Sequence, residues 1–181
     1  MTQPRRLPMP RTFLWALLLV ATIVPTEEAC RKSIDPIAAL EPIDVVTGWF
    51  DAGIVEGGKN KLVPSVSLRL RNKSTEAVRS IQINAIFRRV GEAEMWGEHF
   101  GWAVERDGLP PGELTKELVL QSALGYTSDT PRLQMLQNSQ FVDAKVELFL
   151  KQGSQVWAKL AEYPIQRQLL TRDMVPGTAP R

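Results

Sequence analysis

Alternation of apolar and polar residues dominates the chain between about residues 45 and 170. In LVPSVSLRLRN, the residues from Pro64 to Leu70 at every second position are apolar, and serines and arginines lie between them. VRSIQINAIFRR repeats this alternation from Ile81 to Phe87. A period of two is the pattern of strands that bury one face. The polar residues NKSTEA between the two stretches favour a turn, so we expect a β-hairpin here.

Further strands follow on both sides of the turn signal RDGLPPGE. TKELVLQS predicts a short strand, and VDAKVELFLKQGSQVWAKLAEYPI predicts two more, joined at KQGSQ; TPRLQMLQNSQ instead suits about one helical turn. In EMWGEHFGWAVER every second residue from Trp96 to Val104 is apolar except Glu98. This alternation favours core positions for Trp96, Phe100, Trp102 and Val104. The pattern predicts an all-β fold, an antiparallel Ig-like β-sandwich of about seven strands, with a small barrel as the alternative.

An apolar run near the N-terminus lies outside this pattern. Phe13–Val24 follows Arg5, Arg6 and Arg11. Its twelve residues would rise about 18 Å as a helix, which is short against about 30 Å of hydrocarbon core. A basic flank, a short apolar core and then polar residues form the layout of a secretory signal. We therefore expect residues 1–29 to be a helical signal peptide or membrane anchor, and the protein to be exported.

Cys30 is the only cysteine and follows this segment. The arrangement resembles bacterial lipoprotein signals, in which a cysteine just after the apolar core is acylated, and Ala29 is the small residue that precedes it. Glu27 and Glu28 occupy positions where those signals carry an aliphatic and a small residue. Lipidation of Cys30 is the leading hypothesis, and soluble secretion and an uncleaved anchor remain alternatives.

The rest of the chain divides by composition. Residues 30–43 contain Pro36 and Pro42 among mixed charges and are predicted to be a spacer. Residues 44–170 are predicted to form the β-sandwich, and residues 171–181, rich in Pro and Gly, a flexible tail.

The segment from Ser65 to Glu92 resembles the strand–turn–strand of exported bacterial β-sandwich domains, including the FxLYD-type domains. In that outline a strand ends in Asn, a polar turn follows, and the next strand leads to an aromatic residue and a glycine. Asn72, Phe87 and Gly91 match it, although the FxLYD tetrapeptide itself is absent. The resemblance implies a cell-envelope protein and carries over no catalytic residues.

Composition and charge exclude several functions. The chain has 181 residues, of which 44% are hydrophobic and 23% charged, enough to build one core without staples. A single cysteine excludes an internal disulfide and a cysteine-based zinc site. The net charge is +2, and the N-terminal arginines contribute part of it. No basic stripe remains for nucleic acid, so we expect no nucleic-acid partner.

The candidate catalytic and cofactor-binding motifs lack residues that their chemistry requires. Gly53, Gly58 and Lys59 have the spacing of a phosphate-binding loop, but Asn60 stands where that loop needs Ser or Thr, so we expect a gap between two strands. His99 is the only histidine, and strand parity turns it away from the nearby glutamates. We expect a half-exposed strand histidine, no metal, no cofactor and no enzymatic activity.

Aromatic residues are the remaining candidates for binding. Trp157 has the parity opposite to that of its apolar neighbours and is predicted to face outward. Trp157 and Tyr126 are therefore a possible binding surface, because aromatic rings stack on sugars and hold peptides. We expect a non-enzymatic protein, membrane-associated at the bacterial cell envelope through a lipid or signal anchor, acting in protein–protein contact or structural support. A carbohydrate- or other ligand-binding module that uses these aromatics is the alternative.

Overall fold

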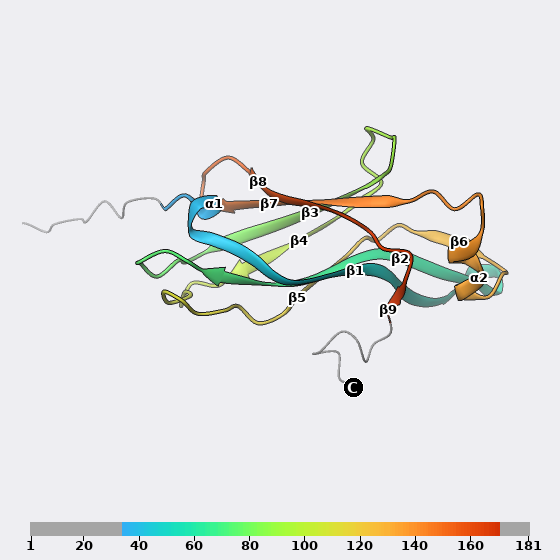
Figure 1. The fold of residues 1–181 in the computed structure, drawn as a ribbon, viewed down its shortest axis with the longest axis horizontal. Coiled ribbons are helices and arrows are strands. Elements are labelled where there is room, and N and C mark those ends of the chain that lie inside the picture. Colours follow the sequence, from blue (N-terminus) through green and yellow to red (C-terminus); the bar gives the residue numbers. More distant parts are fainter. Residues whose placement is uncertain (1–33, 171–181) are drawn as a thin grey trace, which may run out of the picture. The chain divides into compact units, whose positions relative to one another are not determined.

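The computed structural model describes residues 34–170 of the chain, and the predicted signal or anchor, Cys30 and the predicted tail lie outside them. Within these residues nine strands form two sheets in two layers (Figure 1). The first sheet has the order β5-β2-β1-β9, with β6 also paired to β2, and the second has the order β4-β3-β7-β8. Every pairing is antiparallel except that of β1 with β9. The prediction of an all-β sandwich is confirmed.

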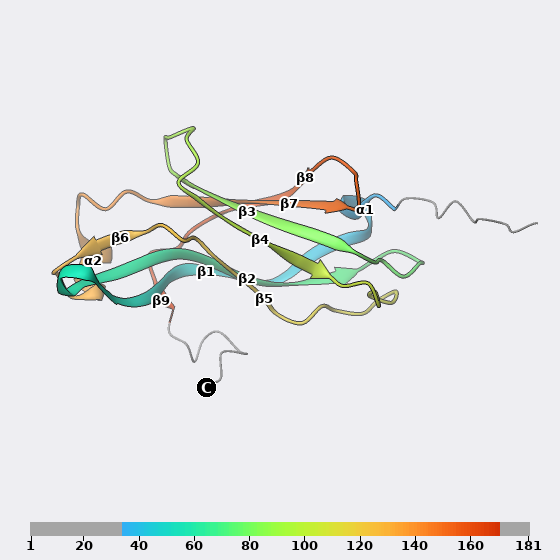
Figure 2. The ribbon, with the colours of Figure 1, turned by 180° about the vertical axis from the view of Figure 1, so that it is seen from behind.

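The two sheets are built from strands of very different length. The first sheet contains β1 (Leu40–Val55), β2 (Lys59–Asn72), β5 (Leu118–Gln121), β6 (Tyr126–Ser128) and β9 (Leu169–Leu170). The second contains β3 (Ile81–Arg89), β4 (Gly97–Val104), β7 (Ala144–Gln152) and β8 (Ala158–Pro164). Two short helices, α1 (Pro36–Ala39) and α2 (Arg132–Gln137), lie at opposite ends of the sandwich (Figures 1 and 2), and a 3-10 turn, Glu56–Gly58, joins β1 to β2.

Alternate residues of the central strands build the core between the sheets. The fully buried side chains of β3 and β7 are Ile81, Ile83, Ala85, Phe87, Ala144, Val146, Leu148 and Leu150. In β2 the apolar residues from Val66 to Leu70 are also fully buried, whereas Arg69 and Arg71 are exposed. In β3 and β7 these positions agree with the period of two, because each strand lays one face on the opposite sheet. In β2 the prediction is wrong for Ser65 and Ser67, which the alternation puts on the solvent face but which are 1% and 4% exposed, so this part of the strand is buried on both faces.

The predicted hairpin between Ser65 and Phe87 is wrong. β2 and β3 bury the expected residues, but they belong to different sheets, so the turn between them carries the chain across the sandwich. Asn72 organises this crossing. Its buried Nδ2 donates to the carbonyls of Glu76 and Leu109, each at 2.8 Å, and its Oδ1 accepts from the Ser74 amide at 2.9 Å and hydroxyl at 2.7 Å.

The fold begins earlier than the predicted boundary at residue 44. Asp35 caps α1 by accepting a hydrogen bond from the Ile37 amide at 3.0 Å, and Pro36 occupies the first turn. Ala39 and Leu40 are buried in the core. The last part of the predicted spacer is therefore a helical turn and the start of β1. In residues 34–170 no helix is long and apolar enough to span a membrane.

Candidate functional site

The outer face of the β4-β3-β7-β8 sheet carries a group of exposed aromatic side chains. Phe100 and Trp102 of β4 are 55% and 47% exposed. Phe149 of β7 and Trp157, which immediately precedes β8, are half-buried. Phe100 and Phe149 both lie opposite Asn84 of β3, so they occupy one row across the sheet. We call Phe100, Trp102, Phe149 and Trp157 the aromatic face.

The Trp157 ring lies on the outer face of this sheet, between Phe100 and Lys151. Its ring is 6.0 Å from the ring of Phe100 at an interplanar angle of 83°, an edge-to-face contact. The Lys151 ammonium lies 4.9 Å from the centre of the Trp157 ring on its face. The prediction that Trp157 faces outward agrees with this position. Because the Trp157 and Phe100 rings are nearly perpendicular, they do not form one flat platform.

The structure reverses the prediction that Phe100 and Trp102 lie in the core. The inner face of β4 carries Gly101 and His99, which lie opposite Ile83 and Ala85 of β3, so the large side chains of β4 point to the outside. A register shift near the end of β4 then brings Val104 into the core, where it is 5% exposed. Trp96 precedes the strand and packs against Trp49, with their ring centres 6.0 Å apart.

A signal for this orientation was present in the sequence. Glu98 has the same parity as Phe100 and Trp102, and it is exposed. Burying a carboxylate costs far more free energy than exposing an aromatic ring. The charge of Glu98 therefore indicates that its face of the strand, which includes Phe100 and Trp102, is turned to water.

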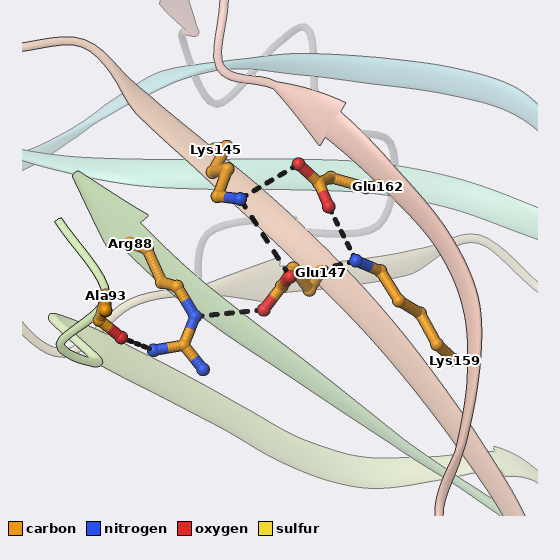
Figure 3. A network of polar contacts seen from close by, with 6 residues as sticks. All are labelled: Arg88, Ala93, Lys145, Glu147, Lys159 and Glu162. Carbon is orange, nitrogen blue, oxygen red and sulfur yellow. Dashed lines mark hydrogen bonds and ion pairs between the residues drawn. The ribbon is translucent and has the colours of Figure 1, made fainter. Parts of the chain in front are cut away.

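The same outer face also carries a group of paired charges, shown in Figure 3. Glu147 accepts hydrogen bonds from Arg88 Nε and Lys159 Nζ, each at 2.9 Å. Glu162 accepts from Lys159 Nζ at 2.6 Å and from Lys145 Nζ at 3.0 Å. We call these five residues the charged cluster.

The hydrogen bonds in the charged cluster stabilise the ionised forms of both glutamates and of Lys159. The hydrogen bonds from Lys159 and Arg88 lower the pKa of Glu147 from 4.5 to about 2. Hydrogen bonds from Lys159 and Lys145 also lower the pKa of Glu162, and those from both glutamates raise the pKa of Lys159. At neutral pH Glu147, Glu162 and Lys159 stay ionised and paired, so these three groups are not suited to accept or donate a proton in catalysis.

Tyr126 does not share a surface with Trp157. It packs on the core side, with its ring 4.6 Å from that of Phe141 and 5.5 Å from that of Trp49. Its hydroxyl donates to the Val142 carbonyl at 3.0 Å, and burial raises the pKa of this hydroxyl. A pocket of about 170 Å³ beside Tyr126 is smaller than typical small-molecule sites. The structure therefore does not join the two predicted aromatics into one binding surface.

His99 is a half-buried strand histidine, as predicted. Its Nδ1 lies 3.2 Å from the backbone oxygen of Gln121 and 3.3 Å from the backbone nitrogen. This contact ties β4 of one sheet to β5 of the other. Among residues 34–170, no three His, Cys, Asp or Glu residues are grouped so that they could hold a metal ion.

The end of the first sheet formed by β1 and β9 is poorly suited to pairing with an added strand. β9 pairs with β1 at Trp49 and Phe50. Next to this pairing, Gln168 Nε2 donates to the Thr47 carbonyl at 2.6 Å, which occupies a backbone acceptor of β1. Pro42 nearer the start of β1 has no amide hydrogen to donate. Such features block edge-to-edge pairing in natural sheets at this edge, while β5, β4 and β8 lie at the other ends of the two sheets.

No protein-family model matches the chain, and no curated protein matches it. A solved structure described as "X-ray structure of Northeast Structural Genomics Consortium target SoR45" is similar to this chain, with 15% sequence identity and a TM-score of 0.42. The alignment covers 81% of this chain and 95% of that one. This degree of likeness carries no argument about function.

Proposed function

We propose that this protein is a non-enzymatic component of the bacterial cell envelope, tethered to a membrane near Cys30, whose sandwich makes protein–protein contact through the aromatic face. The observation that carries the proposal is the exposure of Phe100 and Trp102, at 55% and 47%, on one side of a rigid sheet. Large aromatic side chains contribute most of the binding energy in many interfaces when a partner covers them. The charged cluster beside them would form the polar rim of such an interface.

The geometry favours a protein partner over a sugar. A sugar ring stacks flat on an aromatic ring, and several coplanar rings beside a groove would extend that platform. Trp157 and Phe100 are instead set edge to face at 83°. Tyr126, the other ring of the carbohydrate alternative, contributes its ring to the core side of the sandwich. An uneven, partly apolar sheet face suits the side chains of a protein better.

We also infer an Ig-like arrangement of the two sheets. If β1, β2 and β5 correspond to strands A, B and E of an immunoglobulin domain, their order β5-β2-β1 is the order E-B-A. The order β4-β3-β7-β8 then corresponds to C′-C-F-G of the other sheet. Domains of this architecture serve widely as contact modules, which agrees with the proposal but rests on analogy of fold.

The tether is proposed from the sequence. The basic residues before Phe13–Val24 and the position of Cys30 support export and membrane attachment. Lipidation of Cys30 adds an acyl anchor, and an uncleaved segment would act as an anchor by itself. Either route confines the aromatic face to the vicinity of a membrane, where a low-affinity contact becomes effective because the partners are concentrated.

Site-specific photo-crosslinking tests the contact. A photoreactive phenylalanine analogue at position 100 should yield one dominant adduct with another protein in cells of the native host. The same analogue at Leu133, which is 62% exposed on α2, serves as the control and should not yield that adduct. Trp102→Ala should weaken the adduct without changing the amount of folded protein. Equal crosslinking from both positions, or none from position 100, would refute contact through the aromatic face.

A further inference from the structure

The described chain begins against the turn that joins β7 to β8. The Ile34 amide donates to Gln152 Oε1 at 3.2 Å, and the Ile34 carbonyl accepts from Gln155 Nε2 at 3.4 Å. The Ile34 and Ile37 side chains pack against the core, and Ile37 belongs to α1, which starts two residues after Ile34. These contacts fix the point where the N-terminal segment joins the sandwich. We call residues Lys151–Trp157, which surround this turn, the β7–β8 tip.

Only a few residues of chain separate the tip's contact residue, Ile34, from the proposed lipid attachment at Cys30. Cys30 precedes Ile34 by four residues. An extended chain covers at most about 3.6 Å per residue, so the two residues cannot be more than about 14 Å apart. A lipid on Cys30 would therefore keep the tip close to the membrane surface, whatever path the connecting residues follow.

The tip has the composition of a segment that contacts lipid headgroups. Val156 is 88% exposed, more than any other large hydrophobic residue among those the structure describes. Trp157 follows it, and Lys151 lies over the indole ring at 4.9 Å. Tryptophan prefers the interface between headgroups and hydrocarbon, and lysine extends its ammonium toward phosphate. The sequence KQGSQVW contains no acidic residue that would be repelled by lipid phosphate.

Polarity changes along β7 in the direction that this contact requires. The strand starts in the charged cluster with Lys145 and Glu147, continues through Phe149, and ends at Gln152 beside Ile34 (Figure 3 for the charged part). The carboxylates Glu147 and Glu162 lie opposite each other and farther from the joining point than Phe149, whereas Lys159 lies opposite Phe149. Such a gradient would keep the salt bridges in water while the tip touches the bilayer.

We propose that the β7–β8 tip rests on the headgroup layer of a lipid bilayer, with Val156 inserted, the half-buried Trp157 ring at the level of the headgroups and Lys151 facing lipid phosphate. This inference rests on the proposed tether. Two apolar side chains bind a bilayer weakly by themselves, but a tether makes the contact intramolecular and raises the effective lipid concentration. The contact would orient the sandwich and hold the neighbouring aromatic face at the membrane surface.

A single fluorescent label on the tip tests the proposal. Cys30→Ala removes the only cysteine, so Val156→Cys in that background provides one labelling site. The full chain, labelled with an environment-sensitive nitrobenzoxadiazole group, is reconstituted into phosphatidylethanolamine–phosphatidylglycerol vesicles with the apolar segment as its anchor. This segment ends at Val24, ten residues before Ile34, so the anchor limits their separation to about 36 Å and the contact itself must hold the tip at the bilayer. Leu133→Cys, at an exposed apolar position on α2 at the other end of the sandwich (Figure 1), is the matched control.

Three measurements separate the possible outcomes. We expect the chain to float with the vesicles, and lipids with a nitroxide near the headgroup to quench the label at 156 by at least about twofold, while the label at 133 stays unquenched. Flotation without selective quenching at 156 would overturn the tip contact and leave the tether standing. A chain that stays in the aqueous fraction would refute the tether and the tip contact together. In native membranes, a photo-crosslinker at 156 that reacts with a protein instead of lipid would also overturn the inference.

Discussion

Glu147 is the central acid of the charged cluster, and replacing it with glutamine measures what its charge contributes to folding. Its side chain is 14% exposed and bonds to Arg88 and Lys159. The fall in its pKa from 4.5 to about 2 corresponds to at most about 3–4 kcal/mol of folding free energy. Water reaches the lysines of this surface network, so we expect Glu147→Gln to cost about 1–2 kcal/mol at neutral pH.

The sign of the pH dependence follows from the direction of the shift. The folded-state pKa of Glu147 is lower than the ordinary value, so its stabilisation is present above about pH 4.5 and is lost as the pH falls toward 2. The difference in unfolding free energy between the parent and the Glu147→Gln variant should therefore shrink over this range. Carboxyl groups outside the charged cluster are common to both proteins and cancel in the difference, whereas Glu162 shares Lys159 with Glu147 and adds a coupled contribution.

Urea unfolding of the full chain in a non-ionic detergent, followed by tryptophan fluorescence, measures this difference at several pH values. Glu98→Gln is the matched control, because Glu98 is exposed on the same sheet face and makes one long contact, 3.4 Å to Asn84. It should change the stability by less than about 0.5 kcal/mol. A Glu147→Gln effect that is absent at neutral pH, or equally large at pH 2.5, would refute the reasoning.

Two further substitutions test the crossing between the sheets and a close backbone contact. Asn72→Ala removes four hydrogen bonds and should lower the unfolding free energy by about 2–4 kcal/mol in the same assay, whereas Asn84→Ala removes one bond of 3.4 Å and should cost less than about 1 kcal/mol. Similar losses from both would contradict the role of Asn72. Gly125→Ala drives a Cβ into the Leu62 carbonyl oxygen and should cost more than about 2 kcal/mol, while a Cβ at Gly101 meets no atom within 4 Å. A tolerated Gly125→Ala with unchanged melting temperature would show that this approach is not as close as described.

Parts of the candidate site were predictable and parts were not. The outward position of Trp157 follows from its parity, which is a local property. The exposure of Phe100 and Trp102 depends on which face of β4 is turned toward the opposite sheet, and the large rings concealed the opposite evidence from Glu98. Tyr126 could not be placed from sequence, because its partners Trp49 and Phe141 come from distant parts of the chain.

The sequence by itself determined where β2, β3, β4, β5, β7 and β8 lie, which residues of β3 and β7 are buried, and where α2 interrupts the strands. These features depend on backbone period and on turn residues, which act over a few positions. Only the tertiary structure decided that β2 and β3 face each other across the core instead of pairing side by side. Both arrangements bury the same alternate residues, so the choice depends on long-range pairing and on Asn72, whose four bonds turn the chain from one sheet to the other.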